Sequence, residues 1–155
     1  MDIQEAKEKL LCYTESEWKY KSALSPKLRT FVTFKENYEL EQYITSNLSK
    51  QERSALSQLR CGILPIRIET GRFRNEALPD RICVLCEKQE VEDEKHFMLN
   101  CPCYDKLRQR FLPMAALDNF SDNSEKLIHL LKYYQIQTAK FVNSAFIHRK
   151  KQLYV

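Results

Sequence analysis

Apolar residues recur at three- and four-residue spacings along most of the chain, which is the period of an amphipathic α-helix. The first such stretch follows Asp2, which with Glu5 forms an acidic helix-start signature, and it predicts a helix to about Lys21. The break at Ser25-Pro26 ends this helix. The apolar face of the predicted helix consists of Ile3, Ala6, Leu10 and Tyr13.

The centre of the chain combines one ambiguous stretch with one well-marked helix. Residues 28–34 are rich in aromatic and β-branched residues, and their pattern fits a strand as well as a buried helix. Residues 36–47 carry apolar residues at helical spacing and predict a helix. Ser49 and Glu52 then form a capping box that starts the next helix, and Gly62 is a natural residue for its C-terminal end.

The C-terminal half predicts three more helices. A helix over 102–111 begins at Pro102, because proline is favoured in the first turn. The next has a buried face made of Leu127, Leu130, Leu131 and Tyr134, and the last has one made of Phe141, Val142, Ala145 and Phe146. The final helix ends in Arg149, Lys150 and Lys151, cations that suit the negative end of a helix dipole.

Composition agrees with a small globular protein. With 155 residues, 43% hydrophobic and 30% charged, the chain predicts one domain over 1–155. Glycine occurs only twice, at Gly62 and Gly71, which favours a mainly α fold. No signal peptide or membrane-spanning apolar run is evident, so we expect an intracellular protein, nuclear or cytoplasmic, with no membrane partner and no small-molecule substrate.

Four potential metal ligands lie close together between positions 83 and 101. Cys83 and Cys86 are separated by two residues, and His96 and Cys101 by four, a pattern typical of structural Zn²⁺ sites. Thiols grouped with a histidine in an intracellular chain favour metal over disulfides. Cys103 is an alternative fourth ligand, but we prefer Cys101 because Cys103 falls inside the following helix.

The residues around these ligands support the same interpretation. Glu92, Asp93 and Glu94 stand where a short helix carrying His96 would begin, the end that favours negative charge. We therefore expect a zinc-binding segment over 81–112, with three cysteines and one histidine around a single ion. The predicted fold class is a small, mainly α-helical domain built around one structural zinc site.

The residues "QLRCGILPIRIETGRF" and "RICVLCEKQEVEDEKHFMLNCPCYDKLR" resemble the zinc-binding region downstream of the reverse transcriptase domain in non-LTR retrotransposons. The resemblance is strongest over about residues 55–110. It implies that Cys83, Cys86, His96 and Cys101 bind the metal, and that the region helps to hold template RNA or target DNA beside a polymerase. The chain has no polymerase part, so we expect a separated or domesticated fragment.

The expected function is a non-catalytic module that binds nucleic acid, RNA or DNA. Basic and aromatic side chains near the zinc segment suit contacts to phosphates and bases. The candidate nucleic-acid-binding residues are Arg67, Arg72, Phe73, Arg74, Arg81 and Arg108. The net charge of +4 permits such a partner without requiring it.

Two other functions compete with this one. In a protein-interaction module, the amphipathic helices bind a partner chain and zinc only stabilises the fold. A hydrolase with catalytic zinc is disfavoured, because four protein ligands leave no position for an activated water. His129 and His148 lie in no recognisable catalytic motif, so no enzyme activity is expected.

Overall fold

The structure is a computed structural model that describes residues 2–154, and it is mainly α-helical, as the sequence predicts. The α-helices are α1 (Ile3–Leu24), α2 (Gln42–Thr45), α3 (Lys50–Cys61), α4 (Arg67–Thr70), α5 (Asp105–Phe111), α6 (Met114–Leu117), α7 (Asn123–Tyr133) and α8 (Gln135–Leu153). Single helical turns lie between them: η1 (Pro26–Leu28), η2 (Phe31–Thr33), η3 (Arg72–Arg74), η4 (Leu78–Asp80), η5 (His96–Asn100) and η6 (Pro102–Tyr104). Within residues 2–154 no strand forms, and none of the helices is long and apolar enough to cross a membrane.

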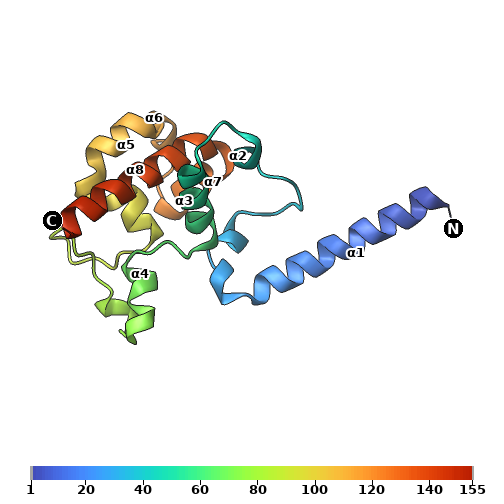
Figure 1. The fold of residues 1–155 in the computed structure, drawn as a ribbon, viewed down its shortest axis with the longest axis horizontal. Helices are drawn as coiled ribbons and strands as arrows, with labels where there is room; N and C mark the ends of the chain where they lie inside the picture. The colour runs from blue at the N-terminus through green and yellow to red at the C-terminus, as the bar shows by residue number, and fades with distance from the viewer. Residues whose placement is uncertain (1, 155) are drawn as a thin grey trace.

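The core lies around α8, which packs against α3, α5 and α7 in the body of the molecule (Figure 1). Leu56 and Leu59 of α3 are fully buried, as are Phe141 and Val142 of α8. The predicted apolar faces of these helices are therefore the faces that pack together. Burying each such side chain contributes roughly 1.5–3 kcal/mol, so these contacts dominate the stability of the body.

Local signals at both ends of α3 are confirmed. The Ser49 side chain accepts a hydrogen bond from the Glu52 backbone amide at 3.2 Å, and the Glu52 carboxylate accepts one from the Ser49 amide at 2.8 Å. Gly62 ends the helix with a φ of 78°, a left-handed conformation that glycine adopts without strain. An added Cβ there would lie 2.7 Å from Thr30 Oγ1, so the position excludes side chains for a second reason.

Two expectations for residues 28–47 need correction. Residues 28–34 form neither a strand nor a long helix, but the short turns η1 and η2. The helix expected over 36–47 is only the single turn α2. The reason is tertiary: Gln135 of α8 accepts a hydrogen bond from the Tyr43 amide at 3.1 Å and donates one to Glu41 at 2.8 Å. Leu40, one of the apolar residues within 36–47, is 74% exposed.

Helix α1 forms as predicted but projects from the body, as Figure 1 shows. Its C-terminal part is attached through Trp18, whose ring packs edge-on against Phe31 at 6.1 Å between centroids. Asp2 stands at the N-cap position without making a side-chain cap bond. The apolar face of the helix is not buried: Ile3 is 73% exposed and Leu10 is 65% exposed.

Candidate metal centre

A hairpin-like turn presents the first two thiols. Ile82 and Val91 form an isolated antiparallel bridge, in which the Cys83 amide donates to the Glu90 carbonyl at 2.9 Å. The chain reverses between these residues, and Cys83 and Cys86 lie on the first half of the turn. The turn is held to the rest of the segment by Lys88, whose ammonium donates to the carbonyl of Asn100 at 2.8 Å.

The other two donors come from the ends of a π-helical turn, η5. The Cys101 amide donates to the His96 carbonyl at 2.8 Å, a five-residue step that is one residue longer than in an α-helix. In a regular α-helix, residues five apart point about 140° away from each other, so His96 and Cys101 would diverge. The π-turn turns both side chains to the same side, and Asp93 caps its start by accepting from the His96 amide at 2.7 Å.

The four predicted ligands come together in one cluster that can hold a metal ion. One donor atom from each of Cys83, Cys86, His96 and Cys101 lies within 4.8 Å of the other three. The sulfurs of Cys83 and Cys101 are 3.9 Å apart, and the Cys86 sulfur is 3.4 Å from His96 Nε2. Cys103 is not in the cluster, because its thiol donates to the Leu85 carbonyl at 2.9 Å.

The electrostatics of the cluster favour a cation at its centre. A hydrogen bond from Cys101 lowers the pKa of the Cys83 thiol well below its usual value, although burial opposes this. The same contact, with burial, raises the pKa of Cys101, and burial raises the pKa of Cys86. Three sulfurs this close cannot all be anionic without a positive charge among them. A metal ion bound by these four residues would supply that charge.

Glu90 orients the histidine of the cluster. Its carboxylate lies 2.8 Å from His96 Nδ1, so this nitrogen donates to Glu90 and leaves Nε2 free to face the thiols. Burial acts to lower the pKa of His96, but hydrogen bonds and charges from Cys83 and Glu90 outweigh it and raise the pKa. Carboxylates commonly hold metal-binding histidines in this way. The sequence analysis missed Glu90, because only the register of the hairpin places it beside His96.

A buried ion pair connects residues 81–112, the metal segment, to α8. Glu92 has no exposed surface, and its carboxylate accepts from Arg149 Nη2 and from the Arg67 amide, both at 2.9 Å. Burial raises the pKa of Glu92, against the opposing effect of the Arg149 charge. Neither role was predicted: Glu92 was expected to cap a helix, and Arg149 to complement the dipole at a helix C-terminus. Its guanidinium is instead buried.

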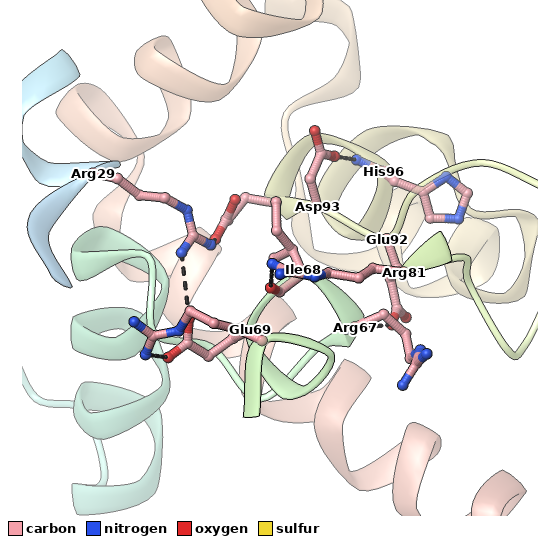
Figure 2. Close-up of polar contacts among 10 residues, drawn as sticks. Arg29, Arg67, Ile68, Glu69, Arg81, Glu92, Asp93 and His96 are labelled. Atoms are coloured by element: carbon pink, nitrogen blue, oxygen red, sulfur yellow. Dashed lines mark hydrogen bonds and ion pairs between the residues drawn. The ribbon is translucent and has the colours of Figure 1, made fainter. Parts of the chain in front are cut away.

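Three of the six predicted nucleic-acid-binding residues serve the fold instead. Arg108 is 3% exposed and donates to the carbonyls of Met98 and Cys101, so its side chain is not accessible to a partner in this structure. Arg81 is half-buried and donates to the Ile68 carbonyl at 2.8 Å (Figure 2). Arg67 forms an ion pair with Glu76. The guanidinium groups of these residues satisfy backbone and carboxylate oxygens that folding removes from water.

Arg72, Phe73 and Arg74 form the exposed turn η3 beside the metal segment. The Phe73 ring is 74% exposed, and the Arg72 guanidinium lies 5.0 Å from its centroid. Arg72 is anchored by Glu69 at 2.6 Å, and Glu69 is also contacted by Arg29 (Figure 2). These three predicted residues are therefore accessible to a partner.

Comparison with known proteins adds no family assignment: no protein-family model matches the chain, and searches of curated proteins and of solved structures gave no match.

Proposed function

We propose that this protein is a non-catalytic nucleic-acid-binding domain stabilised by one structural zinc ion. The dimensions of the cluster support zinc as the metal that it binds. Zn–S bonds of about 2.3 Å and Zn–N bonds of about 2.0–2.1 Å give tetrahedral edges of roughly 3.8 Å between sulfurs and roughly 3.6 Å from sulfur to nitrogen. The corresponding separations here are 3.9 and 3.4 Å. Four protein ligands close the coordination shell, so the ion has no position for a substrate.

The observation that carries the nucleic-acid proposal is the exposed turn Arg72-Phe73-Arg74, which precedes the metal segment in the sequence. Arginines reach phosphates and an exposed aromatic ring stacks on bases. Glu69, Glu92 and Glu94 do not interrupt this surface, because they are buried against Arg29 and Arg149. The resemblance to the zinc-binding region of non-LTR retrotransposons supports the same function.

Binding to a labelled oligonucleotide, measured by fluorescence anisotropy at several salt concentrations, tests this proposal. Replacing Arg72 and Arg74 by alanine should flatten the log–log salt dependence by about 1 to 2 units, since each phosphate contact contributes about 0.7 with single strands. The control is Lys106→Ala with Arg110→Ala, which removes the same charge from exposed positions on α5. If the wild-type chain binds no oligonucleotide at low salt, the nucleic-acid function is refuted.

The exposed face of α1 favours a second candidate function, self-association through a coiled coil. Its residues alternate at spacings of three and four, the pattern of a coiled-coil seam. The members of this seam are Ile3, Ala6, Leu10, Tyr13, Glu17, Tyr20 and Leu24. Tyr13, Tyr20 and Leu24 are each 64% exposed, so within this chain the seam has little cover.

Analytical ultracentrifugation of the full chain over a wide concentration range tests the second candidate. We expect a dimer that dissociates on dilution. The double variant Leu10→Asp with Tyr13→Asp should abolish this dimer. The matched control is Glu8→Ala, which alters α1 outside the seam. A wild-type chain that stays monomeric at every concentration would remove this candidate and leave the nucleic-acid proposal untouched.

A further inference from the structure

A groove with a volume of 880 Å³ lies beside the metal segment. Its lining residues come from α3, from the C-terminal half of α8, and from α4 and η3; Figure 1 shows where α3, α4 and α8 lie. Val84, between the first two predicted ligands, also lines it. Segments that are far apart in sequence therefore form one continuous concave surface.

The charge of this groove is entirely positive. Its lining includes Lys50, Arg67, Arg74, Arg149 and Lys150, and it includes no aspartate or glutamate. The chain as a whole has 21 acidic residues among 155, so a lining of this size without one is a local enrichment of cations. Such a concave basic surface attracts polyanions, because its low-dielectric walls concentrate the positive field.

Three of these five cations form no ion pair with a carboxylate in the described part of the chain. Arg67 is paired with Glu76 and Arg149 with Glu92. Lys50, Arg74 and Lys150 make no ion pair within residues 2–154, and all three are exposed. A ligand with several negative charges would satisfy the groups that the fold leaves unpaired.

Apolar and aromatic side chains share the same lining. Phe146, Leu153 and Tyr154 come from the C-terminal part of α8 and its cap, and Tyr154 is 82% exposed. An acidic peptide or a free phosphate would use the cations but has no need of an exposed aromatic ring. Bases splayed out of a single strand stack on such rings while the backbone follows the cations. A duplex keeps its bases stacked inside and fits a recessed surface poorly.

We infer that this groove binds single-stranded nucleic acid, with the backbone phosphates on Lys50, Arg74 and Lys150 and a base stacked on Tyr154. The inference rests on the proposed nucleic-acid function and identifies the strand type and the surface. Arg74 belongs both to the exposed turn η3 and to the groove lining, so the turn forms one end of the path. Val84, in the turn between Cys83 and Cys86, is part of the wall. The predicted zinc site is therefore directly connected to the surface that binds the strand.

The first test compares two triple variants of the full chain that lose equal charge. Lys50→Gln, Arg74→Gln and Lys150→Gln remove the three uncommitted groove cations. The control is Lys27→Gln, Lys106→Gln and Arg110→Gln, three exposed cations outside the lining. With fluorescein-labelled oligo(dT), we expect the groove variant to flatten the log–log salt slope by about 2, from 0.7 for each phosphate lost. The control should keep the wild-type slope.

The second test separates stacking from charge. Tyr154→Ala should weaken binding roughly 5- to 150-fold, corresponding to the loss of one stacked base, and should leave the salt slope unchanged. Tyr154→Phe keeps the ring and should retain wild-type affinity. Because Tyr154 is exposed, neither change threatens the fold, and circular dichroism checks this. Oligo(U) and oligo(dT) distinguish RNA from DNA as the strand.

The outcomes separate this inference from the function on which it rests. If wild type binds neither oligonucleotide, the proposed function fails. If wild type binds but both triple variants weaken binding equally, the function stands and the groove is the wrong surface. Equal affinity for a hairpin duplex would overturn the preference for single strands. If the wild type binds polyglutamate but no nucleic acid, and the groove variant loses the polyglutamate binding, the groove is a site for acidic peptides.

Discussion

Replacing Cys83 or Cys86 by serine is expected to abolish metal binding and to unfold residues 81–112. The segment has little regular structure of its own: one isolated bridge, the turns η5 and η6, and the short helix α5. Binding of structural zinc in finger peptides contributes about 10–16 kcal/mol, which is coupled to folding. Serine cannot supply a soft thiolate, so most of that free energy is lost. The core of α3, α7 and α8 should partly survive.

Elemental analysis of natively purified protein, with hydrogen exchange over residues 81–112, measures this effect. We expect one zinc per chain in the wild type, and amide protection in this segment only with metal. Cys12→Ser and Cys103→Ser are matched controls that should keep the metal, since Cys12 is exposed on α1 and Cys103 bonds the Leu85 carbonyl. Metal loss in Cys103→Ser with retention in Cys101→Ser would show that the ligand assignment is wrong.

Replacing Arg149 by methionine is expected to destabilise the whole fold by about 3–5 kcal/mol, because it leaves the charge of Glu92 buried without its partner. Glu92 has no exposed surface, and its remaining hydrogen bonds come from the Arg67 amide and the Cys83 thiol. This pair joins α8 to the metal segment across 57 residues of sequence. Its loss therefore disturbs the contact on which both parts depend.

Equilibrium unfolding in urea measures the change. Lys150→Met is the control on the same helix; Lys150 is exposed and its replacement should change the free energy of unfolding by less than about 0.5 kcal/mol. The double variant Glu92→Gln with Arg149→Met should be less destabilised than Arg149→Met alone, since it removes the uncompensated charge. Similar stability of Arg149→Met and wild type would show that the pair does not carry this contact.

Sequence reasoning succeeded where the determining interactions are local. The capping box of Ser49 and Glu52 and the left-handed Gly62 act over three or four residues, so their residue types suffice to place α3. The 3.6-residue period of α7 and α8 likewise identified which side chains are buried. The cluster of three thiols and an imidazole that can hold a metal ion was also predicted, because its members were identified by spacing and residue chemistry.

Long-range contacts decided the rest. α2 is short because Gln135, 92 residues away in sequence, binds the Tyr43 amide. The π-turn of η5 brings His96 and Cys101 to one side, whereas the pattern there predicted only a short helix. The roles of Glu90, Glu92 and Arg149 depend on which charged groups folding removes from water together, and a charged residue read alone appears solvated.

The arginines show most clearly which properties follow from the sequence and which depend on the tertiary structure. From the sequence, Arg67, Arg72, Arg74, Arg81 and Arg108 were equivalent cations near a metal turn. Composition and spacing determined a mainly α domain with one compact cluster of metal ligands. Only the tertiary structure shows that Arg108 is buried, that Arg67 forms an ion pair with Glu76, and that Arg74 lines one groove together with Lys50 and Lys150. The physical reason is that the availability of a charge depends on its partners and exposure, which are properties of the packed chain.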